Sequence, residues 1–110
     1  MKKNSISLKK NRCKSTDAIL RILHDYKDIL KNRYKTKEIG LFGSYVKSEQ
    51  KKHSDIDILV EFTIGHKTFD NYMELKFFLE AILHRKIDLI IKTAVRKELK
   101  DTILNETIYV

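Results

Sequence analysis

Residues 38–62 read EIGLFGSYVKSEQKKHSDIDILVEF, and this stretch decides the fold. It begins with a short, largely apolar run over 38–42 that is closed by Gly43 and Ser44, which is typical of a buried strand ending in a tight turn. It ends with 55–62, where alternating acidic and apolar residues give way to a continuous apolar run. That pattern predicts a second strand, buried along most of its length. We expect the polar segment between them, over 45–52, to begin with a short helix.

Helical patterns surround these two strands. Apolar residues recur at three- and four-residue steps over 17–33, 69–82 and 94–105, which predicts three amphipathic helices. The run IDLII at 87–91 predicts a third strand, and a short apolar tail follows at 108–110. The sequence therefore predicts an α/β domain with one small sheet covered by helices.

The composition fits one small domain. The chain has 110 residues, of which 42% are hydrophobic and 35% charged, with no Pro and only three Gly. This is enough apolar material for one core and too little Pro or Gly for a flexible linker. No segment approaches the roughly 20 apolar residues that span a bilayer, so we expect no membrane contact.

The net charge of +8 is concentrated at the N-terminus, where residues 1–14 contain six Lys and Arg and no acidic residue. We interpret 1–15 as a basic, flexible arm and 16–110 as the folded domain; a contact of the arm with RNA, a membrane or a partner is the alternative. The arm lacks the apolar stretch of an export signal. The single Cys13 excludes an internal disulfide and favours a reducing compartment, so we expect a cytoplasmic protein.

Three aspartates are the candidate catalytic residues. Asp55 and Asp57 share one face of their predicted strand, with Cα atoms roughly 6.6 Å apart, although a D-x-D pair alone is more often a solvent-facing alternation. Asp88 interrupts an otherwise apolar run, where an unpaired carboxylate is costly to desolvate. If its strand lies beside 55–62, the three carboxylates can converge, and divalent cations would relieve their repulsion. Mg²⁺ is favoured because every ligand is a hard oxygen and phosphates can complete its coordination.

A candidate phosphate site lies at the corner between the first strand and the following helix. Free backbone N–H groups and the positive end of a helix dipole favour an anion there. Gly43 lets the backbone approach closely, the Ser44 hydroxyl can donate to a β- or γ-phosphate oxygen, and Lys47 can neutralise charge one turn later. The alternative for Ser44 is a plain helix N-cap.

Together these residues resemble the minimal nucleotidyltransferases of the DNA polymerase beta superfamily. The resemblance rests on Leu41-Phe42-Gly43-Ser44, a ten-residue gap, SDIDILV at 54–60 and IDL at 87–89, and it extends over about residues 16–110. It implies the polymerase-beta-like nucleotidyltransferase fold, with a small mixed sheet of three or four strands flanked by helices. After Ser44 the chain has Val-Lys-Ser at 46–48, where the family commonly has a small residue followed by Arg-Gly.

The resemblance also implies a site and a reaction. Two Mg²⁺ ions and a nucleoside triphosphate, usually ATP, would be bound, with Asp55 and Asp57 bridging the metals. Asp88 would complete one metal site and help to activate the attacking hydroxyl. Many such proteins resemble antitoxins that inactivate HEPN-type RNase toxins by attaching AMP to a toxin tyrosine, and this is the function we expect.

Two alternatives to that function stay open. One is nucleotidyl transfer to a small molecule or an RNA end, with the arm at 1–14 assisting RNA capture. The other is a non-catalytic module that binds nucleotide and blocks its partner sterically. A chain of 110 residues leaves none for a separate acceptor-binding domain, so we expect the acceptor to dock from outside or across a homo- or hetero-oligomer interface.

Overall fold

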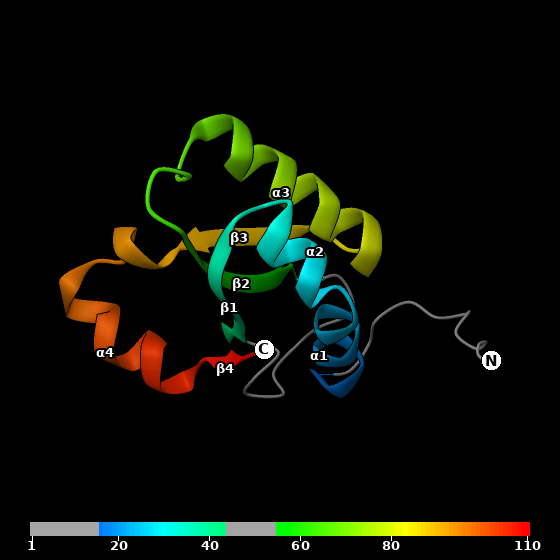
Figure 1. The fold of residues 1–110 in the computed structure, drawn as a ribbon. Helices are drawn as coiled ribbons and strands as arrows, with labels where there is room; N and C mark the ends of the chain where they lie inside the picture. The colour runs from blue at the N-terminus through cyan, green and yellow to red at the C-terminus, as the bar shows by residue number, and fades with distance from the viewer. Residues whose placement is uncertain (1–15, 44–54) are drawn as a thin grey trace.

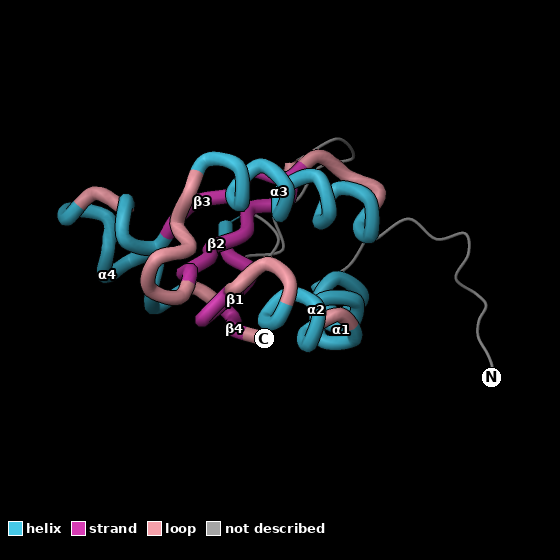
Figure 2. Tube along the Cα trace, turned by 45° about the horizontal axis from the view of Figure 1, so that its top comes forward, coloured by secondary structure: helices cyan, strands magenta, loops and turns pink. Residues whose placement is uncertain are grey.

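A four-stranded mixed sheet forms the centre of the molecule (Figure 1, Figure 2). The computed structural model describes residues 16–43 and 55–110. In spatial order the strands are β3 (Ile87–Ile91), β2 (Ile56–Phe62), β1 (Thr36–Phe42) and β4 (Ile108–Tyr109). β1 pairs antiparallel with both β2 and β4, whereas β2 and β3 run parallel. The prediction of a small mixed sheet flanked by helices is therefore confirmed.

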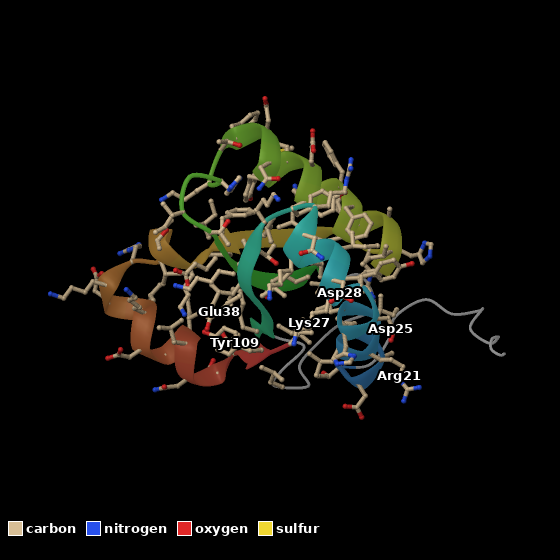
Figure 3. The ribbon with its side chains drawn as sticks, viewed as in Figure 1. Arg21, Asp25, Lys27, Asp28, Glu38 and Tyr109 are labelled. Atoms are coloured by element: carbon tan, nitrogen blue, oxygen red, sulfur yellow. The ribbon has the colours of Figure 1, made fainter. Side chains whose placement is uncertain are left out.

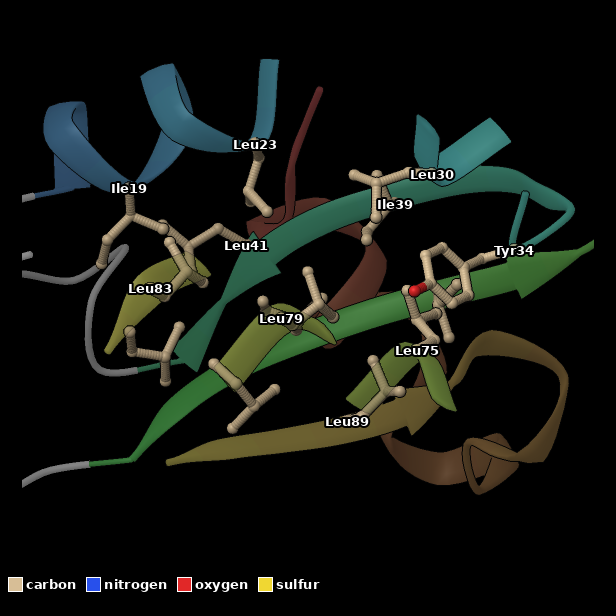
Figure 4. Close-up of a cluster of buried hydrophobic side chains, with 14 of the residues drawn as sticks. Ile19, Leu23, Leu30, Tyr34, Ile39, Leu41, Leu75, Leu79, Leu83 and Leu89 are labelled. Carbon is tan, nitrogen blue, oxygen red and sulfur yellow. The ribbon is translucent and has the colours of Figure 1, made fainter. Parts of the chain in front are cut away.

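Three helices cover one face of this sheet: α1 (Thr16–Asp25), α2 (Lys27–Asn32) and α3 (Phe69–Leu83). Parallel strands need a crossover connection, and α3 provides it between β2 and β3. Side chains from the helices and the strands meet in one buried cluster (Figure 4). Its members include Ile19, Leu23, Leu30, Ile39, Leu41, Leu75, Leu79, Leu83 and Leu89.

The segment between β3 and β4 joins the two edges of the sheet. It consists of the 3-10 helix η3 (Lys92–Ala94) and of α4 (Lys97–Glu106), in which no residue is buried. Among the described helices, none is long and apolar enough to cross a bilayer.

Two of the predicted helices differ from those observed. The single helix expected over 17–33 is observed as two helices, α1 and α2, interrupted only at Tyr26. Helical hydrogen bonds continue on both sides of the interruption, since the Tyr26 amide donates to the Ile22 carbonyl and the Leu30 amide donates to the Tyr26 carbonyl. The helix expected over 94–105 begins only at Lys97, as α4, because Val95 and Arg96 are extended and separate it from η3. The helix expected after residue 44 and the arm at 1–15 lie outside the described residues.

The apolar tail forms the edge strand β4, which pairs with β1 through Gly40 and Leu41. A Cβ added to Gly40 would lie 2.5 Å from Thr107 Cγ2 and 2.9 Å from the Ile108 carbonyl oxygen. A glycine is therefore needed for the tail to approach this closely. The amide of Val110 extends the pairing by donating to the Ile39 carbonyl at 2.9 Å.

Candidate active site

Asp57 and Asp88 lie directly across from each other on the parallel strands β2 and β3. The residues on either side of each aspartate are buried against the helices, at no more than 3% exposure: Ile56, Ile58, Ile87 and Leu89. Because successive side chains in a strand point to opposite faces, both aspartates point to the face that α1, α2 and α3 leave open. Paired residues on neighbouring strands have Cα atoms roughly 4.8 Å apart. The fold therefore brings two of the three candidate carboxylates to one place.

Asp55 lies immediately before β2 and is exposed. It precedes Asp57 by two residues, so it continues the same open face toward the edge of the sheet. As placed, the side chains do not form a closed ligand cluster: within 16–43 and 55–110, no three His, Cys, Asp or Glu side chains are grouped so that they could hold a metal ion. What relates Asp57 to Asp88 is therefore the pairing of their backbones on neighbouring strands.

Asp88 is exposed in the structure. The sequence led us to expect that its carboxylate would be buried and would need compensation, and that expectation is wrong. Ile87 and Leu89 enter the core, but β3 is an edge strand and its other face is open at this position. An exposed carboxylate on this face is accessible to a substrate, so the position of Asp88 suits a functional role although the desolvation cost does not arise.

The end of β1 lies against the Asp57 carboxylate. Phe42 pairs with Asp57, and Gly43 follows with a φ of +81°. A Cβ added to Gly43 would collide with Asp57 Oδ2 and lie 2.9 Å from its Cγ. Gly43 is thus required both for its left-handed backbone and for its lack of a side chain. The other candidate phosphate ligands, Ser44 and Lys47, lie outside the described residues.

The chemical character of these groups suits a divalent cation and a phosphate. Two carboxylates on paired positions supply the hard oxygen ligands that Mg²⁺ prefers. The bare backbone at Gly43 leaves no side chain between the end of β1 and Asp57. A phosphate held near Gly43 would therefore lie close to whatever these aspartates bind.

A charged cluster at the other end of the same sheet face was not foreseen from the sequence. Glu38 of β1 and Glu61 of β2 are paired directly, an arrangement that destabilises a sheet when both are charged. Lys92 relieves it, because its Nζ donates to Glu38 Oε1 at 2.6 Å and lies 3.8 Å from Glu61 Oε1. The same Nζ is 5.4 Å from the ring centre of Tyr109, which lies beside Glu38 (Figure 3). The partners are separated by 54 residues in the chain, so no local pattern indicates them.

Replacing Lys92 with Met is expected to lower the free energy of unfolding by about 1 kcal/mol at pH 7, because two opposed carboxylates lose their cation. Its hydrogen bond to Glu38 raises the pKa of Lys92 in the folded state. The stabilisation is therefore complete below the unfolded pKa of about 10.4 and is lost as the pH rises through the folded value. Urea unfolding at pH 7 and above pH 10.5 measures both effects.

Lys37→Met is the matched control for this cluster. Lys37 Nζ lies 4.0 Å from Glu61 and its side chain is 64% exposed, so its removal should have little effect. If the Lys92 and Lys37 variants are equally stable at pH 7, the Lys92 contacts do not stabilise the sheet.

The chain matches known proteins over most of its length. The family described as nucleotidyltransferase domain matches residues 23–110. A Methanocaldococcus jannaschii protein, named as a candidate protein adenylyltransferase, is 46% identical over 99 residues, which is 88% of this chain and 99% of that protein. Protein adenylyltransferase MntA of Thermococcus cleftensis is 40% identical over 89 residues, which is 81% of this chain and 89% of MntA.

Solved structures agree with this match. The structure of a candidate minimal nucleotidyltransferase aligns with a TM-score of 0.73 and 27% identity, covering 86% of this chain and 95% of that one. A toxin–antitoxin structure with AMP-PNP aligns with a TM-score of 0.61 and 27% identity, covering 84% and 69%. The family and fold expected from the sequence are confirmed. This chain belongs to the nucleotidyltransferase domain family and is a nucleotidyltransferase similar to those of the minimal type.

Proposed function

We propose that this protein is a Mg²⁺-dependent antitoxin that transfers AMP from ATP to a tyrosine of a HEPN-type RNase toxin. The observation that carries the proposal is the pairing of Asp57 with Asp88 on parallel strands, with Gly43 packed on the Asp57 carboxylate. The relatives named protein adenylyltransferase support the reaction, and the toxin–antitoxin structure with AMP-PNP supports the role and the nucleotide.

The carboxylates have distinct roles in the proposed reaction. Asp55, Asp57 and Asp88 would hold two Mg²⁺ ions, which, when bound, supply positive charge to the phosphates and lower the pKa of the attacking hydroxyl. Asp57 is half-buried beside the end of β1, where it can orient a nucleotide held at Gly43. Asp88 is exposed on the open face, where an incoming tyrosine can reach it.

The proposed transfer is a single displacement at the α-phosphorus of ATP. The tyrosine oxygen attacks the α-phosphorus, the bond from that phosphorus to the bridging oxygen breaks, and pyrophosphate leaves. The hydroxyl proton passes to the Asp88 carboxylate and then to water. In this scheme Ser44 and Lys47 hold the β- and γ-phosphates, so that leaving group and nucleophile stay in line.

We assign the transferase domain to residues 16–110 and treat 1–15 as a basic arm outside it. We place the protein in the cytoplasm, where ATP and an RNase toxin would both be available.

The position of the labelled phosphate in ATP distinguishes adenylyl transfer from phosphoryl transfer. The purified chain is incubated with Mg²⁺ and a HEPN-type protein encoded beside it, using ATP labelled at either the α- or the γ-phosphate. Adenylyl transfer predicts that only the α-label becomes protein-bound, and that peptide mass spectrometry places it on a tyrosine. Labelling from the γ-phosphate would indicate a kinase, and labelling of RNA added to the mixture would favour the nucleic-acid alternative.

A further inference from the structure

The outer edge of β3 is held by side chains of α3. β3 is an edge strand, so it has β2 on one side only. The amide of Ile56 donates to the Lys86 carbonyl at 3.0 Å, so the backbone groups of residues 86, 88 and 90 face β2 and those of 87 and 89 face the free edge. Buried backbone groups at such an edge need partners from elsewhere.

Two residues of α3 provide these partners. Glu80 Oε2 accepts a hydrogen bond from the Ile87 amide at 3.2 Å, and the Tyr72 hydroxyl donates to the Leu89 carbonyl at 2.6 Å. Both bonds are partly buried. Ile87 and Leu89 are the residues on either side of Asp88, so α3 pins the strand immediately before and immediately after the candidate catalytic carboxylate.

The surroundings of Tyr72 agree with this arrangement. Burial raises the pKa of Tyr72, and the negative charge of Asp88 raises it further. Tyr72 therefore stays protonated at neutral pH and remains a hydrogen-bond donor. α3 lies along β3 in both views of the fold (Figure 1, Figure 2).

We propose that Tyr72 and Glu80 are positioning residues that replace the missing neighbour strand of β3 and fix the backbone of Asp88 opposite Asp57. This inference rests on the proposed role of Asp88. It adds two residues of α3, which covers the opposite face of the sheet, and their loss should weaken the site. Groups that orient a metal-binding carboxylate typically contribute tenfold or more to metal affinity or activity.

Glu80→Leu, Glu80→Gln and Tyr72→Phe separate positioning from bulk stability. Leu removes the acceptor for the Ile87 amide, whereas Gln removes the charge and keeps an acceptor oxygen. We expect amide exchange of Ile87 to become roughly fivefold to tenfold faster in Glu80→Leu and to be restored in Glu80→Gln. Glu74→Leu and Tyr26→Phe are the controls. Glu74 lies on α3 and Tyr26 lies between α1 and α2, and no hydrogen bond is described for the side-chain oxygens of either residue.

Transfer and metal binding are the functional readouts. Glu80→Leu and Tyr72→Phe should each lower kcat about tenfold with little change in the KM for ATP, and should weaken Mn²⁺ binding to a similar extent. Glu80→Gln and the controls should match the wild type. Unchanged kcat and unchanged Mn²⁺ affinity in Glu80→Leu, with faster Ile87 exchange, would mean that the bonds protect the edge and do not position Asp88.

The two proposals fail in different ways. If the wild type transfers no nucleotide, the proposed function is wrong. Mn²⁺ affinity in Glu80→Leu against Glu80→Gln then still decides whether α3 positions Asp88. If the wild type transfers nucleotide and all variants equal it, the function stands and the positioning role is overturned.

Discussion

Asp57→Asn is expected to lower the rate of nucleotide transfer by at least about a thousandfold. Asn has nearly the same shape as Asp, so it preserves the packing against Gly43 while removing the negative charge. Asp57 is half-buried and paired with Asp88, which makes it the carboxylate best placed to contact both a cation and a phosphate. Initial rates with α-labelled ATP measure the loss, and circular dichroism checks that the fold is kept.

Asp101→Asn is the control, because Asp101 is exposed on α4. It should transfer nucleotide like the wild type. Asp88→Asn and Asp55→Asn should also be severely impaired, since each removes a ligand from the same open face. A double variant of Asp57 and Asp88 that still transfers nucleotide would remove the role assigned to both.

Gly43→Ala is expected to reduce transfer by about a hundredfold and to lower the free energy of unfolding by about 1–2 kcal/mol. The stability loss follows from a φ of +81°, which a residue with a Cβ adopts at a cost. The loss of transfer follows from the added methyl group, which must displace the Asp57 carboxylate. Transfer rates and urea unfolding of the same protein separate the two effects.

The chain contains a matched control for this substitution. Gly65 has a φ of +87°, and a Cβ added there meets no atom within 4 Å. Gly65→Ala should therefore lose a similar amount of stability and keep wild-type transfer. Equal transfer by the two variants would mean that Gly43 matters only for its backbone conformation.

The sequence predicted the parts of the fold that depend on local pattern. Strand β3 begins and ends as the run at 87–91 predicts. Strand β2 begins at Ile56, one residue later than the predicted start at Asp55. The helix expected over 69–82 is α3, which ends one residue later at Leu83, although it carries exposed aromatic residues such as Phe69 and Phe77 in addition to its buried leucines. The interruption at Tyr26 is marked by no Pro or Gly, so the local pattern does not indicate it.

The residues of the candidate site could be predicted from the sequence, but their arrangement in space could be predicted only in part. The spacing of Asp55 and Asp57 fixes their common face, but the pairing of Asp57 with Asp88 depends on which strands become neighbours. The exposure of Asp88 follows from the edge position of β3, which the apolar run at 87–91 does not reveal. The bonds from Tyr72 and Glu80 depend on the register between α3 and β3 and likewise have no sequence signature.

Anomalous diffraction from crystals grown with Mn²⁺ and a non-hydrolysable ATP analogue shows whether Asp57 and Asp88 hold the metal together. We expect manganese peaks roughly 2.1 Å from carboxylate oxygens of both residues, with the triphosphate next to Gly43. Manganese bound without Asp88, or a nucleotide located away from the paired strands, would contradict the proposed site.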